Sequence, residues 1–453
     1  MKKYFKEVII ILCVVLAIVP HSAFSQSAQP NTEFSLQSAI DYALKHNANY
    51  LNAELDVKMA QYKNKEVLGM GLPQISGSID LKDYFDIPTS LIPGQFFGGP
   101  AGSYIPVKFG TQYNATAGGS VSQIIFSSDY IVGLQAAKEL RVFSEKNLGR
   151  TKVETIVTIT KAYYSALINR ERIKTLEANI TRVKRLYDDT KALNISGFSE
   201  KIDVERVELT YNNLITEKEK LMRLVGLTET LLKFQMGYDL KQSINLTDEL
   251  KAEQLQDISL LEEMKINYDA RPEFMILQSQ QKLNNLDIRR YKMQYLPSLV
   301  GYASYTKQAQ RTTFNIFDFS QKWFPIGVVG ATLNVPIFSG GQKYYRIQQA
   351  KISLQKTSNS LDYMKLFIQF EATSSSISYK NAYVSMLTQK KNKDLAQNIY
   401  DTSFKKYNAG VGSNLELIIA ESALKEAETN YLSAIYDLVV AKTDLDRALG
   451  NIK

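Results

Sequence analysis

Residues 417–448 read LIIAESALKEAETNYLSAIYDLVVAKTDLDRA, with apolar side chains at alternating intervals of three and four residues. This spacing is typical of a long amphipathic α-helix, because residues three and four apart lie on the same helix face. Every second residue of the apolar seam is alanine, which allows a neighbouring helix to approach closely. The stretch therefore predicts a long helix within a bundle. The seam consists of Leu417, Ala420, Leu424, Ala427, Tyr431, Ala434, Leu438, Ala441, Leu445 and Ala448.

The sequence repeats itself at an offset of about 213 residues. Asn194-Ile-Ser-Gly197 resembles Tyr407-Asn-Ala-Gly410, and Ile125-Phe-Ser127 parallels Ile337-Phe-Ser339. The period is far too long for a small solenoid repeat, so one domain-sized unit occurs twice. The seam described above has a counterpart at the same offset, formed by Val204, Val207, Tyr211, Leu214, Lys218, Leu221 and Val225.

Each repeat is expected to contain a very long helix. No proline occurs from Ser128 to Ile195 or from Gln342 to Ala409. About 68 helical residues at 1.5 Å each would form a rod on the order of 100 Å long. Glycine-containing turns at about 195–203 and 409–416 would reverse the chain, so that each repeat has two antiparallel rods. Heptads alone also fit an ordinary antiparallel bundle or scaffold.

Short segments between the helices alternate between apolar and polar residues, as β-strands do. Small and hydroxyl-bearing residues occupy one face, as expected for a water-filled lumen. Each segment is about as long as a tilted strand that crosses a membrane, although a soluble hairpin capping a bundle would show the same pattern. We expect these strands at about 72–83, 112–126, 297–306 and 326–338, with the connections 84–111 and 307–325 as surface loops.

Four strands cannot close a barrel within a membrane. Open sheet edges would leave backbone N–H and C=O groups without partners in lipid, at a high cost in free energy. Several chains must therefore contribute strands, and three copies of four would give a barrel of 12. The expected fold is mainly α, with a tandem repeat of long antiparallel helices and a membrane β-barrel completed between copies.

The N-terminus indicates export. Met1-Lys-Lys-Tyr-Phe-Lys6 is a basic region, the apolar run Val8 to Val19 follows, and Ala23-Phe-Ser25 resembles a cleavage site. We therefore predict a signal peptide at 1–25 that is removed from the mature chain. The sequence contains no later run of eighteen apolar residues, the length that a transmembrane helix needs.

The composition argues against an enzyme. The chain has 2 His and 1 Cys, which leaves almost no material for a metal cluster or for a nucleophile with a histidine base. We expect no catalytic residue, no metal and no cofactor. A net charge of +8 over 453 residues, without a cluster of five basic residues, also argues against nucleic acid as a partner.

Taken together, the chain resembles the TolC-like outer-membrane efflux family, the outer membrane factors of tripartite exporters. The resemblance rests on the duplication, on Leu72-Pro73 and Leu296-Pro297 at the strand entries, and on Val335-Pro-Ile-Phe-Ser-Gly-Gly341 before a long helix. It implies a homotrimer in the cell outer membrane, with an α-barrel that extends into the periplasm. It also implies a first repeat at 26–237, an inter-repeat link and equatorial region at 238–270, and a second repeat at 271–453.

The resemblance also implies a functional site at the two helix turns. Asp203 and Glu416 match positions that narrow the periplasmic entrance in this family, although the next acidic position is Ile419 here. The turns would contact a periplasmic adaptor (membrane fusion) protein, through residues that include Gly197, Phe198, Gly410, Val411 and Gly412. Alternatively, these acids simply occupy first turns of helices, where the helix dipole favours negative charge. The same alternative applies to Glu200 and Glu421.

The implied function is a passive exit duct in outer-membrane lipid, to which an inner-membrane pump delivers substrate through the adaptor. A different class of function remains open, because an exported helical-bundle scaffold that transports nothing would share many of these sequence patterns. A periplasmic adaptor fits less well, because its helical hairpin is normally inserted within a single β-rich domain. The sequence does not identify the exported substrate.

Overall fold

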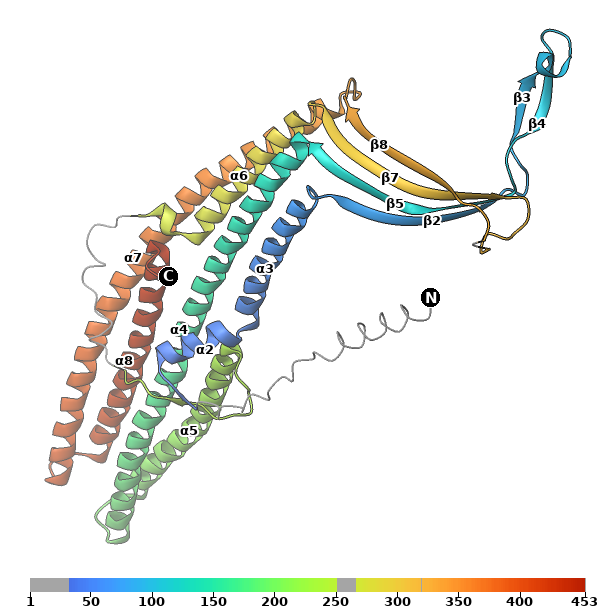
Figure 1. The fold of residues 1–453 in the computed structure, drawn as a ribbon. Helices are drawn as coiled ribbons and strands as arrows, with labels where there is room; N and C mark the ends of the chain where they lie inside the picture. Colours follow the sequence, from blue (N-terminus) through green and yellow to red (C-terminus); the bar gives the residue numbers. More distant parts are fainter. Residues whose placement is uncertain (1–31, 251–265, 319, 453) are drawn as a thin grey trace.

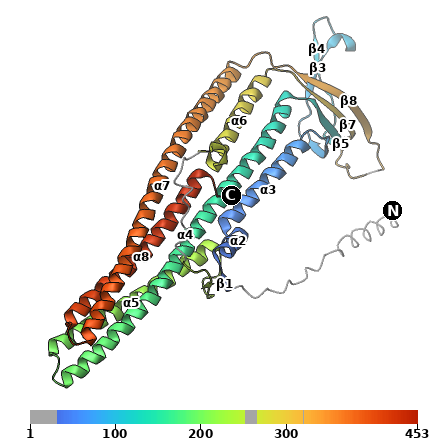
Figure 2. The ribbon, with the colours of Figure 1, turned by 90° about the vertical axis from the view of Figure 1, so that its left-hand side faces the viewer.

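The computed structural model describes residues 32–250, 266–318 and 320–452, and its described part is dominated by two long helical hairpins (Figure 1). In the first, the 68-residue helix α4 (Ser128–Ile195) packs against α5 (Lys201–Met236). In the second, the 67-residue helix α7 (Gln342–Asn408) packs against α8 (Asn414–Leu449). The two pairs lie side by side, and their turns meet at the same end of the molecule (Figure 2). The predicted signal peptide at 1–25 falls outside the described residues.

Two shorter helices complete the upper half of the helical layer. α3 (Ala48–Gly69) packs on α4, α4 packs on α6 (Pro272–Met293), and α6 packs on α7. The order across the layer is therefore α3, α4, α6, α7, so that α3 and α7 form its two edges. Figures 1 and 2 both show this arrangement. Among the described helices, none combines the length and hydropathy needed to cross a membrane.

A four-stranded antiparallel sheet extends from the end of the helices opposite to the turns (Figure 1). Its order is β2-β5-β7-β8, so that β2 and β8 are edge strands whose outer sides have no partner within the sheet. The strands are β2 (Gln74–Asp83), β5 (Tyr113–Phe126), β7 (Ser298–Arg311) and β8 (Phe324–Asn334).

The register places apolar and polar residues on opposite faces of the sheet. Ile79 pairs with Ala117, and Val121 pairs with Ala303, which places these side chains on one face. On the other face, Ser76 and Ser120 pair, and their hydroxyl oxygens lie 2.9 Å apart. The sheet thus has one apolar and one hydroxyl-rich face.

The strand limits differ from those expected in the second repeat. β7 continues to Arg311, beyond the expected end at 306, because its outer residues pair with β5 as far as Tyr113. β8 ends at Asn334, before Val335–Phe338, since Pro336 has no N–H to donate to a ladder. The strand expected at 326–338 is therefore shorter at its C-terminal end.

The connection 84–111, expected as a surface loop, contains a second small hairpin. β3 (Thr89–Pro93) pairs antiparallel with β4 (Tyr104–Lys108), and the 3₁₀ turn η1 (Gly94–Phe97) follows β3. Figure 1 shows this hairpin standing clear of the other strands and of the helices, at the far end of the sheet.

The helices are held together by an apolar core along their shared seams. Nearly all members of the seam between 417 and 448 are buried, and only Ala427 and Tyr431 are half-buried. Halfway along the bundle, Tyr163 of α4 is fully buried and donates a hydrogen bond of 3.0 Å from its hydroxyl to the Phe34 carbonyl. Phe34 belongs to β1 (Glu33–Phe34), which pairs with β6 (Asn245–Leu246) beside α2 (Leu36–His46).

A buried arginine lies at position 271, where the second repeat is expected to begin. Arg271 follows the 3₁₀ turn η4 (Tyr268–Ala270) and is only 2% exposed. Its guanidinium donates to the Ala448 carbonyl at 2.9 Å and to the Glu371 carboxylate at 2.7 Å, and it also pairs with Glu273. One side chain thereby joins α6, α7 and α8. The expected link at 238–270 lies beside this region, although its residues 251–265 fall outside the described part.

Candidate functional site

The two turns that join the long helices form one end of the molecule (Figure 2). Gly197 (φ 79°) and Gly410 (φ 75°) adopt the left-handed conformation that ends each helix and reverses the chain. The next residues donate backbone hydrogen bonds back into the helix, from Phe198 to the Leu193 carbonyl at 2.8 Å and from Val411 to the Lys406 carbonyl at 3.1 Å. These bonds place the apolar side chains of Phe198 and Val411 at the exposed tips.

The two predicted acids occupy equivalent positions, each in the first turn of the second helix of its hairpin. The Glu416 backbone N–H binds the Ser413 hydroxyl at 3.1 Å, and its carboxylate lies 3.3 Å from the Lys406 ammonium. Asp203 pairs with Arg206 at 3.4 Å. Each carboxylate is therefore accompanied by a basic residue of its own hairpin, and both positions also suit the helix dipole.

The structure brings the two tips into contact through a backbone group. The Asn414 side-chain amide donates to the Asp203 carbonyl at 3.3 Å, which joins the start of α8 to the start of α5. Gly412 completes the second turn, where its N–H binds the Lys406 carbonyl at 3.1 Å. The residues predicted for the site thus gather at one end, and Asn414 adds a cross-link that the sequence did not indicate.

A buried ionic cluster lies between the hairpins, farther from the tips. Arg182 of α4 lies 3.1 Å from Glu421 and 4.0 Å from Glu428, both on α8. Asn179 donates to Glu428 at 3.3 Å, and the Tyr400 ring stacks on the guanidinium, whose carbon lies 5.3 Å from the ring centroid. Burial raises the pKa of Glu421 and of Glu428, against the opposing effect of Arg182. Two carboxylates thus share one arginine in a poorly solvated place.

The position of Glu421 corrects its placement from the sequence. It lies in the second turn of α8, it is 5% exposed, and it faces α4 instead of capping a helix start. The sequence contained one indication of this burial. Glu421 and Glu428 are seven residues apart and lie beside the apolar seam on the same helix face. Arg182 gave no comparable signal.

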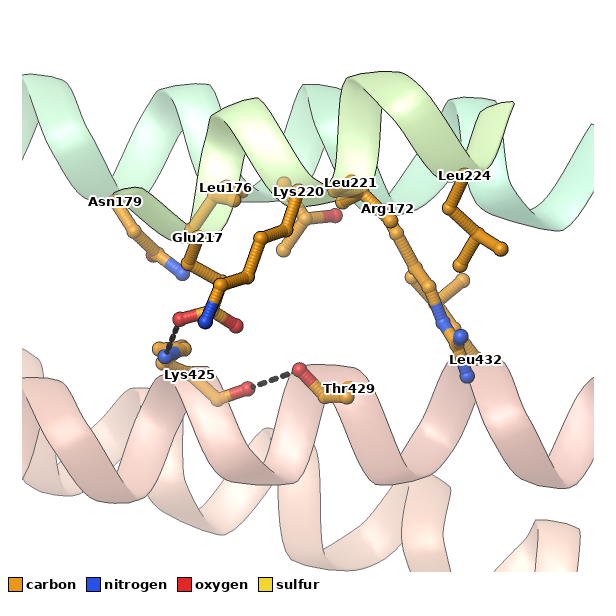
Figure 3. A pocket seen from close by; sticks show the side chains of 11 residues that line it. Arg172, Leu176, Asn179, Glu217, Lys220, Leu221, Leu224, Lys425, Thr429 and Leu432 are labelled. Atoms are coloured by element: carbon orange, nitrogen blue, oxygen red, sulfur yellow. Dashed lines mark hydrogen bonds and ion pairs between the residues drawn. The ribbon is translucent and has the colours of Figure 1, made fainter. Parts of the chain in front are cut away.

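A groove of about 240 Å³ lies between α4, α5 and α8 (Figure 3). Arg172, Lys220 and Lys425 line it, together with one acid, Glu217, which pairs with Lys425. Figure 3 shows Arg172 reaching from α4 toward α8 beside Leu432. Within the described ranges, no group of three or more His, Cys, Asp or Glu residues is placed to hold a metal ion.

Comparison with known proteins identifies the architecture. Residues 270–451 match the family model described as outer membrane efflux protein. The probable efflux pump outer membrane protein TtgC of Pseudomonas putida is 21% identical over 342 residues, which cover 75% of this chain and 69% of TtgC. The second half of the chain thus resembles the outer membrane efflux protein family.

Other relatives agree with this assignment. The outer membrane protein TolC of Vibrio cholerae is 22% identical over 357 residues, which cover 74% of this chain and 77% of TolC. The crystal structure of VceC from Vibrio cholerae superposes with a TM-score of 0.68 at 14% identity, over 92% of this chain and 96% of VceC. The family resemblance and the fold class predicted from the sequence are thereby confirmed.

The matched family and the relatives indicate the class of activity. The family consists of transport proteins of the outer membrane, not of enzymes, and the protein is an outer-membrane exit duct. Channels of this family are trimeric and work with efflux pumps.

Proposed function

We propose that the protein is the passive outer-membrane duct of a tripartite exporter, assembled as a homotrimer whose 12 strands close one barrel in outer-membrane lipid. The observation that carries this proposal is the pair of open sheet edges at β2 and β8. Unpaired backbone groups on these edges are incompatible with lipid, and pairing of each β2 with the β8 of the next copy satisfies all of them.

The helical layer supports the same closure. Large apolar side chains are exposed on both edge helices, where none of the described residues covers them. On α3 they are Leu55, Met59 and Tyr62, and on α7 they include Tyr363, Phe370, Ile377 and Val384. Because α3 and α7 lie at opposite edges of the layer, α3 of one copy meets α7 of the next in a ring.

The tips are the proposed contact with a periplasmic adaptor. Phe198 and Val411 are exposed at the very end of each hairpin, 83% and 79% respectively, and apolar tips of this kind fit the end of another helical hairpin. In the trimer, Asp203 and Glu416 would form acidic positions around the entrance. An inner-membrane pump would supply the energy, since the duct itself only guides the substrate.

Two neighbouring residues on opposite faces of β2 test the barrel. Ile79→Lys places a charge on the lipid face, where it costs about 2–4 kcal/mol near the midplane, whereas Ser78→Lys faces the lumen and is tolerated. The wild-type chain and Ser78→Lys should form heat-dissociable trimers in the outer-membrane fraction and conduct ions in planar bilayers. Ile79→Lys should lose both properties. A freely soluble monomer, or equal behaviour of the two variants, would favour the scaffold instead.

A further inference from the structure

The β3–β4 hairpin is an aromatic projection at the proposed barrel end farthest from the helices (Figure 1). Its residues 87–107 are uncharged, and Lys108 at the end of β4 is charged. Phe96 and Phe97 lie at its tip and are 79% and 65% exposed, and Leu91 and Tyr104 are exposed on its sides. Two other long uncharged runs, 109–128 and 323–342, include strands of the four-stranded sheet, whereas residues 87–107 lie outside that sheet on an exposed projection. Exposed apolar patches of this kind mark interaction sites.

Backbone hydrogen bonds hold the turn of the hairpin in one conformation, with the tip exposed. The Gly94 N–H donates to the Ser103 carbonyl at 2.7 Å, and the Gly99 N–H donates to the Gly94 carbonyl at 2.9 Å, which closes the turn that carries the phenylalanines. At the base, the Lys108 ammonium lies 2.7 Å from the Asp86 carboxylate. The charges therefore mark the base of the hairpin, and the apolar residues mark its tip.

We propose that the three β3–β4 hairpins of the trimer pack against one another over the extracellular mouth and form an apolar cap that the exported substrate displaces. The proposal rests on the trimeric duct proposed above. The hairpin follows β2 in the sequence, and the open edge of β2 faces the next copy in the proposed trimer. The hairpin therefore lies next to the proposed interface between copies.

The dimensions allow the tips to meet. Twelve strands spaced about 4.8 Å apart and tilted about 40° form a barrel with a radius of roughly 12 Å. The five residues of β3 extend roughly 17 Å at about 3.4 Å each, before the turn that carries Phe96 and Phe97 is added. Three hairpins that lean inward can therefore reach the axis.

The charge pattern favours sister copies over the lipid surface. Segments that lie on an anionic membrane surface usually carry lysine or arginine beside their apolar residues, and residues 87–107 carry none. Three identical hairpins on a threefold axis would repel one another if they carried like charges. An uncharged tip removes that repulsion and lets the phenylalanines cover one another.

Disulfide formation between copies tests the contact in the exported chain, because the one cysteine of the sequence, Cys13, lies in the predicted signal peptide. Phe97→Cys should link pairs of subunits within the trimer under mild oxidation. Phe85→Cys, at the base of the hairpin, is the matched control, since points at the barrel rim of different copies are roughly 20 Å apart. The cap would be overturned if trimers of Phe97→Cys form no disulfide between subunits. It would also be overturned if Phe85→Cys forms such disulfides equally well.

Conductance tests what the cap does. The double variant Phe96→Ser with Phe97→Ser should raise the mean current of single channels severalfold, whereas Gln95→Ala at the same tip should leave it unchanged. Equal currents in all three proteins would mean that the tip lies in lipid or on another protein, and would overturn the cap. Absence of trimers from wild type and variants alike would instead refute the proposed assembly, and the cap with it.

Discussion

The guanidinium of Arg182 on α4 lies 3.1 Å from the carboxylate of Glu421 on α8, and this contact joins the two helical hairpins of the chain. Glu421 is almost completely buried, and the same arginine also faces Glu428. Apolar contacts, such as those in the cluster that contains Ile168 of α4 and Leu438 of α8, also join the hairpins. The Arg182 contact adds buried charge to this packing, so that a single substitution can test what the charge contributes.

Arg182→Met should destabilise the helical part by about 3 kcal/mol, because it leaves two poorly solvated carboxylates without their shared partner. Thermal unfolding followed by circular dichroism measures the change. Arg185→Met is the control, since Arg185 pairs with Asp189 on the protein surface, where such pairs contribute about 0.5 kcal/mol or less. Equal melting temperatures for the two variants would show that the buried cluster adds nothing.

Acidification should stabilise the protein through Glu421. Burial raises the pKa of this carboxyl above its ordinary value of 4.5, so the folded state binds the proton more tightly than the unfolded state. The resulting stability is fully present below about pH 4.5 and is lost as the pH rises through the folded-state pKa. Melting temperatures of wild type and Glu421→Gln, compared from neutral pH downward, should diverge, with the variant showing the flatter profile. Parallel profiles would assign the pH dependence to other groups.

Local sequence patterns predicted the helices well and the contacts between hairpins poorly. The proline-free run from Ser128 to Ile195 corresponds to α4 residue for residue, because heptad spacing and the absence of breakers are local properties. The role of Arg182 depends on which face of α4 meets α8, and that is set by packing of segments more than two hundred residues apart. The end of β7 and the β3–β4 hairpin likewise depend on pairing with distant or irregular partners.

Phe370→Glu should weaken the trimer. Phe370 is 69% exposed in the single chain, and in the proposed ring it is covered by the neighbouring copy. Loss of its burial costs about 2 kcal/mol per interface, more than a tenfold change in affinity, before the buried charge is counted. Phe370→Leu keeps the position apolar and should retain the trimer. Gel mobility of unheated samples measures both, and an intact trimer with glutamate at this position would exclude α7 from the interface.

Removal of the tip carboxylates should relieve block by multivalent cations. The Glu416 side chain is 45% exposed and that of Asp203 is 26% exposed, so Glu416 is the more accessible to an ion in the proposed entrance. Three copies on a threefold axis bring like charges together, and such a ring binds multivalent cations. The block of single-channel current by hexaamminecobalt(III), added on the helical side, should weaken severalfold in Glu416→Gln and less in Asp203→Asn. If both acids serve only the helix dipole, each variant will lose about 0.3–1 kcal/mol of stability and the block will not change.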